Sequence, residues 1–233
     1  MDPVYHLVGR LRKALDLGRP SAVERPGSQV ASMVDLPPVR PPIPRAKTAD
    51  RILDVAERLV QVHGFNAFSY ADIASELGIR KPSLHHHFPT KARLGRALIA
   101  RYEDRFREAL TAISRSTDDA PTRLRVYAEL YGKVLRKKRM CLCGVLAADF
   151  QTLPRPMRAG VLGFFALNEQ WLAGVLEEGR RSKTLRFDGP VAPIPAFLVS
   201  SLEGAMLLAR SHGDVSRFDA AVARLLGDLA RAA

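Results

Sequence analysis

A stretch of 26 residues between Glu76 and Glu103 contains no acidic side chain. Its charged side chains are all cations: Arg80, Lys81, Lys91, Arg93, Arg96 and Arg101. Lysines and arginines gathered in this way can pair with phosphates, which dominate the affinity of proteins for nucleic acids. The whole chain shares the bias, because 36 Lys and Arg against 24 Asp and Glu give a net charge of +12. The charge therefore favours a polyanionic partner, either nucleic acid or an anionic membrane surface.

The acid-free stretch overlaps two short predicted helices joined by a tight turn. Ser69 and Asp72 have the spacing of a capping box, which predicts a helix that ends at Gly78. Pro82 fits the first turn of a second helix that runs through His87. A glycine between two helices allows a left-handed turn, so the second helix leaves at a steep angle and can enter a DNA major groove about 12 Å wide. We predict a helix-turn-helix whose outer face carries Lys81, Ser83, His85 and His86.

Further helices are predicted on both sides of this motif. Thr48 can cap a helix that ends at Gly64, and Thr90 can cap a longer helix after the motif. From Ala120 onward apolar residues recur at helical spacing, and no segment keeps the alternation of a strand. The stretch 157–179 is apolar on most faces, which predicts a central helix. The fold class is therefore all-α.

Proline marks the boundary before these helices, because eight of the 16 prolines lie in the first 44 residues. We predict three parts: a flexible Pro-rich extension over 1–45 with at most one short helix, a three-helix DNA-binding domain over 46–95, and a larger helical domain over 96–233. The sequence contains no uninterrupted run of about 18 apolar residues and no secretory signal pattern, which predicts a cytoplasmic protein without a membrane-spanning helix.

Several segments together resemble the DNA-binding region of the TetR family of bacterial transcriptional regulators. They are GFNAFSYADIA at 64–74, LGI at 77–79 and KPSLHHHFPTK at 81–91, followed by Leu94. The specific resemblance spans about Thr48 to Tyr102, and beyond it only the general helical build is similar. His85 stands where the family usually has tyrosine, and Arg80 stands where a small capping residue is common.

The resemblance implies a homodimer in which the last two helices of each protomer pack as a four-helix bundle. It also implies that the C-terminal domain binds a small-molecule effector and controls the separation of the two DNA-binding domains. The DNA-contacting residues by this resemblance and the charge pattern are Ser69, Tyr70, Arg80, Lys81, Ser83, His85, His86 and Lys91, with Lys91 gripping a phosphate at a helix N-terminus.

The C-terminal part also contains polar and aromatic residues on helices that could enclose a cavity. The candidate effector-binding residues are Tyr127, Tyr131, Phe150, Phe164, Asn168 and Trp171. Most aromatic residues of this region must belong to the core, and spacing alone does not separate the two roles.

Two cysteines, Cys141 and Cys143, follow the basic run 136–139. Neighbouring cations lower a thiol pKa and favour thiolate, which makes a redox or electrophile switch conceivable. The alternative is that both are small buried hydrophobic residues.

The sequence shows no phosphate-binding glycine loop, hydrolase motif or zinc-protease motif, so we predict no enzyme and no cofactor. Three consecutive histidines on one helix point about 100° apart and cannot chelate one metal ion. We predict a ligand-responsive regulator of transcription, most simply a repressor that releases a palindromic operator. The alternatives are a helical small-molecule-binding protein or enzyme with an incidental basic region, and a non-specific DNA-binding protein.

Overall fold

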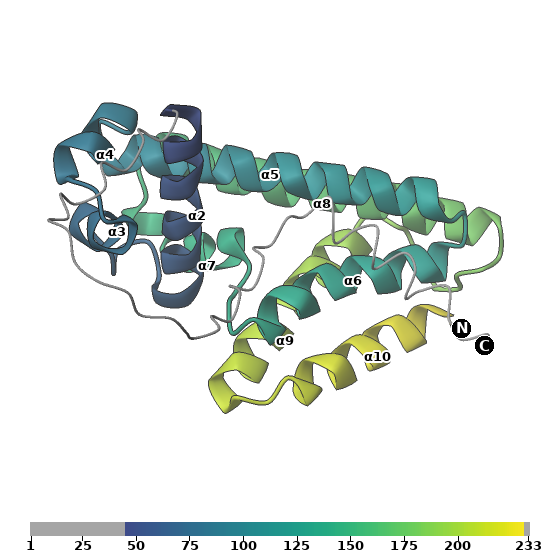
Figure 1. Ribbon diagram of the computed structural model, residues 1–233. Helices are drawn as coiled ribbons and strands as arrows, with labels where there is room; N and C mark the ends of the chain where they lie inside the picture. Colours follow the sequence, from purple (N-terminus) through teal and green to yellow (C-terminus); the bar gives the residue numbers. More distant parts are fainter. Residues whose placement is uncertain (1–44, 231–233) are drawn as a thin grey trace, which may run out of the picture.

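The computed structural model describes residues 45–230, and within this range the backbone forms nine α-helices, one short 3-10 helix and no strand (Figure 1). The all-α prediction is therefore confirmed for the described residues. The predicted Pro-rich linker and the short helix before it lie outside this range.

The N-terminal helices are short and followed by one long helix. They are α2 (Arg45–His63), α3 (Tyr70–Leu77), α4 (Lys81–His87) and α5 (Lys91–Ser116). We call α2–α4 together with the first turns of α5 the head. The prediction that Thr48 caps α2 is wrong, because the helix already begins at Arg45 and Thr48 lies within its first turns. The predicted cap at Thr90 is confirmed, since its side chain accepts a hydrogen bond from the Arg93 amide at 3.2 Å.

The remaining helices, with the rest of α5, form what we call the body. They are α6 (Ala120–Arg136), α7 (Leu142–Ala148), the 3-10 helix η1 (Phe150–Thr152), α8 (Arg155–Arg181), α9 (Ile194–His212) and α10 (Ser216–Ala230). The helix α7 ends at Ala148, and the chain continues through Asp149 into η1.

The central helix of the body is α8, as its apolar composition predicted. It packs against α5, α6, α7 and α9, and Figure 1 shows it running beside α5 along the length of the molecule. Its buried face includes Phe164, Leu172 and Leu176, each of which has no exposed surface. Burying each of these side chains contributes roughly 1.5–3 kcal/mol. This face connects the core of the body to that of the head through α5.

Two described helices, α8 and α9, are long and apolar enough to cross a membrane by length and composition alone. Core helices of soluble proteins meet the same criteria, and both helices pack against other helices of the body. The sequence prediction of no membrane-spanning helix rested on a different criterion, the absence of an uninterrupted apolar run. A few polar residues interrupt both helices without removing their apolar character.

The head and the body share α5, which is continuous over 26 residues. The predicted boundary between residues 95 and 96 falls inside this helix, near Gly95. The two parts are therefore joined by a rigid helix rather than by a loop, and the boundary itself stays a prediction.

Candidate functional site

The turn between α3 and α4 forms as its sequence predicts. At the start of α3 the Ser69 amide donates to Asp72 Oδ2 at 2.7 Å and the Asp72 amide donates to the Ser69 side chain, which together form the capping box. The Ala71 amide also donates to Ser69 Oγ at 3.2 Å. The hydrogen bond from the Ser69 backbone, followed by that from its hydroxyl, lowers the pKa of Asp72. Gly78 ends α3 with φ 62° and ψ 35°, a left-handed conformation that glycine adopts without steric cost. The chain then continues through Ile79 and Arg80 into α4.

Most of the outer face of α4 is exposed to solvent. Leu84 is the only buried residue of this helix and has no exposed surface. Lys81, His85 and His86 are exposed, while Ser83 is half-buried. A helix with one buried position must turn most of its surface to solvent, so the predicted groove-facing side chains lie together on an open face.

Arg80 immediately precedes this helix and is also exposed. It occupies the N-cap position of α4, but its side chain makes no capping hydrogen bond. The guanidinium therefore remains available to a partner. The cap that a small polar residue would provide is missing, which agrees with the departure noted in the sequence.

Tyr70 connects α3 to the end of α4. Its hydroxyl donates to the Phe88 carbonyl at 2.7 Å, and its ring centroid lies 4.9 Å from that of His85. Burial raises the pKa of Tyr70 to about 12, so the phenol remains a protonated donor at neutral pH. His85 Nδ1 lies 3.4 Å from the Pro89 carbonyl oxygen, at the outer limit of a hydrogen bond. Tyr70 therefore orients the exposed His85 ring.

Lys91 begins α5 but its ammonium turns back toward the head. Nζ donates to the Phe68 carbonyl and lies 4.8 Å and 4.2 Å from the ring centroids of Phe65 and Phe68. Partial burial lowers the pKa of Lys91, while Asp72 and Asp149 oppose this shift. The predicted phosphate contact requires Nζ to share or leave its bond with Phe68, which the sequence did not show.

The six cations of the acid-free stretch have different environments. Arg80, Lys81, Arg93 and Arg96 are exposed. Arg101 instead pairs within the protein, with Nη1 at 2.8 Å from Asp54 Oδ1 and Nη2 at 3.2 Å from Glu57 Oε2. Sequence reasoning missed the buried Glu57, which also accepts from Arg105. Four exposed cations near the outer face of α4 thus form the candidate phosphate-binding surface.

The aromatic residues predicted to bind an effector lie mostly in one packed cluster. Tyr127 donates to Asn168 Oδ1 at 2.8 Å, its oxygen lies 3.0 Å from that of Tyr131, and Asn168 Nδ2 donates to the Phe164 carbonyl at 2.7 Å. Trp171 stacks on Tyr127 with a centroid distance of 5.4 Å and donates to Ser114 Oγ at 2.9 Å. These polar groups therefore satisfy one another.

Phe150 lies apart from that cluster, and the guanidinium of Arg158 lies 5.7 Å from its ring centroid. Neither Phe150 nor any of the five clustered residues lines the three cavities described next.

Three cavities lie on the surface of the described part of the body. One of about 1190 Å³ lies beside the 180–189 segment, α9 and α10, and one of about 770 Å³ lies between α6 and α10. The third, of about 910 Å³, lies where the end of α2 meets α7, α8 and α9. Only this third cavity borders both the head and the body, so we call it the junction groove.

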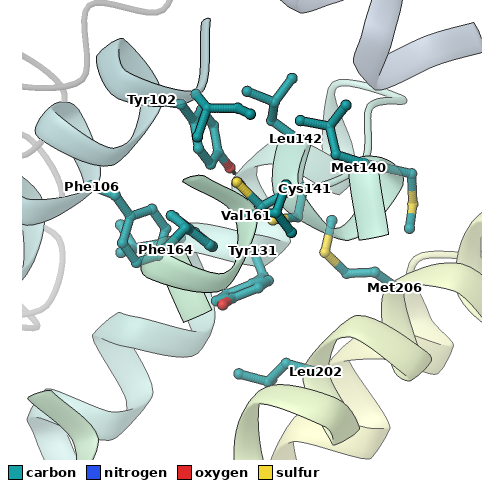
Figure 2. Close-up of a cluster of buried hydrophobic side chains, with 14 of the residues drawn as sticks. Tyr102, Phe106, Tyr131, Met140, Cys141, Leu142, Val161, Phe164, Leu202 and Met206 are labelled. Atoms are coloured by element: carbon teal, nitrogen blue, oxygen red, sulfur yellow. Dashed lines mark hydrogen bonds between the residues drawn. The ribbon is translucent and has the colours of Figure 1, made fainter. Parts of the chain in front are cut away.

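Both cysteines are buried, with 2% of Cys141 and none of Cys143 exposed. Figure 2 shows the Cys141 sulfur beside the Tyr102 hydroxyl, which donates to it at 3.8 Å, within a cluster that α9 joins through Leu202 and Met206. Burial, followed by the negative charge of Glu203, raises the pKa of both thiols well above its usual value. The prediction that the adjacent basic run lowers the pKa is wrong, because desolvation dominates at these positions.

We expect both thiols to resist alkylation in the native protein. Iodoacetamide reacts with thiolate, and burial disfavours that form and blocks access. Mass spectrometry of the native protein at pH 8 should show little modification over a time in which the urea-unfolded protein gains two carbamidomethyl groups. Rapid native modification of either cysteine would contradict this expectation and support the thiol switch.

The comparisons with known proteins agree with the geometry of the head and the body. Residues 52–98 match the family model of bacterial regulatory proteins of the tetR family, and residues 120–225 match that of the tetracyclin repressor-like C-terminal domain. A TetR-family transcriptional regulator of known structure from Agrobacterium tumefaciens is 31% identical, with a TM-score of 0.78 over 80% of this chain and 100% of that one.

Further relatives are similar. A TetR transcriptional regulator from Legionella pneumophila is 33% identical, with a TM-score of 0.72 over 78% of this chain and 97% of that one. The transcriptional regulator AcuR from Cereibacter sphaeroides is 28% identical over 152 residues, which are 63% of this chain and 69% of AcuR. The chain described here therefore belongs to the TetR family of bacterial transcriptional regulators.

Proposed function

We propose that this protein is a ligand-responsive repressor that binds a palindromic operator as a homodimer in the cytoplasm. The observation that carries the proposal is the open outer face of α4, which combines exposed Lys81, His85 and His86 with nearby exposed cations. A recognition helix of this kind enters the major groove, while flanking lysines and arginines bind phosphates. The body then supplies dimerisation and effector binding.

The proposed dimer uses α9 and α10, which lie side by side in each protomer (Figure 1). Three large apolar side chains of α9 remain exposed in one protomer: Phe197 (61%), Leu207 (58%) and Leu208 (61%). Exposed apolar side chains gathered on one element are typical of an interaction surface, and a twofold axis would cover them with the same surface of a second copy.

Direct hydrogen bonds connect the body to the end of α2 in the head. Arg210 of α9 donates to the Gln61 carbonyl at 2.9 Å and to the Val62 carbonyl. The Met140 amide also donates to the Gln61 carbonyl at 3.2 Å, and the Phe65 amide donates to Asp149 Oδ2 at 3.1 Å. An effector that prefers a different arrangement of α9 would weaken DNA binding by that preference, typically about 1–3 kcal/mol.

A gel-shift titration tests the regulator proposal. The full-length protein is titrated against the DNA upstream of its own gene, with excess random DNA and at several salt concentrations. Sequence-selective binding supports the regulator. Uniform binding that falls steeply with salt would instead identify a non-specific DNA-binding protein, and no binding to any duplex would contradict the proposal.

We expect Lys81→Ala and His86→Ala to affect DNA binding differently. Loss of a phosphate-binding lysine should weaken binding to all sequences alike and lower the slope of log K against log salt by about one. Loss of a base-contacting histidine should change the order of preference among operator variants. Arg115→Ala is the matched control, because it removes one exposed cation at the far end of α5. An identical effect of all three substitutions would rule out the assigned roles.

A further inference from the structure

The junction groove has a mainly apolar wall that belongs to both halves of the molecule. Its apolar lining includes Leu162 and Phe165 from α8, Val199 and Leu207 from α9, and Met140 before α7. Val62, His63 and Gly64, at the end of α2, form its edge toward the head. A volume of about 910 Å³ falls within the range of small-molecule sites.

One carboxylate oxygen in this groove lacks a hydrogen-bond partner in the described structure. Glu203 of α9 lines the groove, and its Oε1 is enclosed without a hydrogen-bond partner in the described structure. The other polar contact of the carboxylate is with the Cys141 thiol, which is protonated because its pKa is raised. Burial also raises the pKa of Glu203 to about 7. An enclosed acceptor without a donor is costly, and a ligand that supplies an N–H would remove that cost.

Gly144 of α7 makes room for this carboxylate. A Cβ on Gly144 would lie 2.2 Å from Glu203 Oε2 and 3.0 Å from Oε1. Any larger residue at position 144 would displace the carboxylate. The glycine therefore leaves the space between α7 and α9 that the Glu203 carboxylate occupies. The carboxylate position is thus built into the packing of two helices.

The charges around the groove favour a cation. Glu169 and Asp149 line it together with Glu203, which gives three carboxylates in a protein of net charge +12. The cationic side chain among them is Arg210, whose guanidinium is already bound to the Gln61 and Val62 carbonyls. His63 lines the same edge and is exposed. An anionic ligand would meet mainly carboxylates, whereas a cation would find an unsatisfied acceptor.

We infer that the junction groove is the effector site, that it binds a protonated amine with an apolar body, and that the amine donates a hydrogen bond to Glu203. The hydrocarbon part lies on Leu162, Phe165 and Val199. A permanently quaternary ammonium lacks an N–H and leaves Oε1 unsatisfied, so it binds more weakly. This inference rests on the proposed ligand response, and it adds the site and the chemical class of the ligand.

The position of the groove allows a bound amine to affect the contact between the body and the head. The groove is lined by Val62 and Arg210, and these two residues are also joined by one of the hydrogen bonds that hold α2 against α9. A bound amine that draws Glu203 toward its ammonium moves the α9 turn next to Arg210. The DNA-binding head and the amine therefore compete for one arrangement of α9.

The test is calorimetric titration of the full-length protein with matched pairs: hexylamine and hexanol, octylamine and octanol, phenethylamine and phenethyl alcohol. We expect at least one amine to bind about tenfold or more tightly than its alcohol, and Glu203→Gln to remove this difference. Glu177→Gln is the matched control, since Glu177 is an exposed α8 residue outside the groove lining. Equal binding of every amine and its alcohol, or an undiminished preference in Glu203→Gln, would overturn the inference.

A second arm measures the amine-to-alcohol ratio between pH 5.5 and 8. The ratio should rise as Glu203 ionises near pH 7, and the rise should vanish in Glu203→Gln. The other titratable or charged groups that line the groove or interact with the carboxylate are His63, Asp149, Glu169, Arg210, Cys141, Cys143 and Tyr131. A rise that persists in Glu203→Gln would assign it to one of these groups and contradict the role of Glu203.

DNA binding separates this inference from the proposed function. Release of DNA by a compound without an amine, with no amine binding, would overturn the inference and leave the ligand-responsive repressor intact. Amine binding that depends on Glu203 but leaves DNA affinity unchanged would support the amine site and overturn its role as the effector site. If the ligand-free protein bound no DNA, this result would contradict the proposed function but not the amine site.

Discussion

A Leu84→Ala variant is expected to lose the order of α4 while the body stays folded. Leu84 is the only buried residue of this seven-residue helix and has no exposed surface. Truncation of a fully buried leucine to alanine costs about 2–5 kcal/mol. A helix this short has no independent stability, since isolated helices below about 12 residues are marginal in water. The recognition helix would therefore fray from the head, and sequence-selective DNA binding would be lost with it.

Hydrogen exchange checks this expectation without knowledge of the operator. Amides of α4 should exchange at least about tenfold faster in Leu84→Ala, while amides of α8 keep their protection. His86→Ala provides the matched control, because His86 lies on the same helix but is exposed. Unchanged protection of α4 in Leu84→Ala would show that the turn at Gly78 and the contact between Tyr70 and Phe88 hold the helix without its apolar anchor.

An Asn168→Ala variant is expected to lower the free energy of unfolding by about 2–3 kcal/mol. Asn168 is completely buried in α8, and both ends of its amide are used, by the Tyr127 hydroxyl and the Phe164 carbonyl. Its removal leaves a small cavity and takes an acceptor from a buried phenol. Burial raises the pKa of Tyr127 above its usual value, so this phenol stays protonated and needs an acceptor.

Urea unfolding measures the change, with Gln170→Ala as the control at an exposed position of the same helix. The structural role of Asn168 predicts reduced stability with unchanged affinity for small amines. The opposite pattern, full stability with altered ligand affinity, would instead favour the ligand contact that the sequence suggested for Asn168.

The sequence predicted the helix-turn-helix well because the interactions that form it are local. Ser69 and Asp72 bond across three residues, and Gly78 sets its own backbone conformation. Pro82 fits the first turn of α4 whatever packs against it. Signals of this kind can be read within one turn of the chain. The predicted cap at Thr48 is wrong because the residues before it also adopt a helical conformation, so the Thr48 side chain does not cap the helix.

The side-chain roles that sequence reasoning missed depend on contacts between distant segments. Lys91 bonds to Phe68, 23 residues earlier, and Arg101 pairs with Glu57, 44 residues earlier. A charge pattern counts both cations as available for phosphate, whereas the fold uses them within the head. No local signal in the sequence distinguishes them from the exposed Arg93 and Arg96.

The cysteines show the same dependence on distant segments, because their pKa is raised where the neighbouring sequence predicted that it is lowered. The basic run beside Cys141 in the sequence suggested thiolate, but the charged group that interacts with this thiol is Glu203, 62 positions along the chain. Glu203 itself carries no sequence signal, because a single glutamate in an apolar helix is compatible with a surface position. Only the close approach of Gly144 in α7 to Glu203 in α9 shows that the carboxylate is enclosed.

Because α5 is continuous from the head into the body, a small tilt of this helix in the body produces a large displacement of its end in the head. A straight helix of 26 residues is about 39 Å long at 1.5 Å per residue, so a pivot of about 5° at one end displaces the other by roughly 3 Å. In a twofold assembly two such helices would move in directions related by the twofold rotation, so movements away from the axis add and double the change in their spacing. Adjacent base pairs are about 3.4 Å apart, so this motion changes the register of the assembly on a duplex by one or two base pairs.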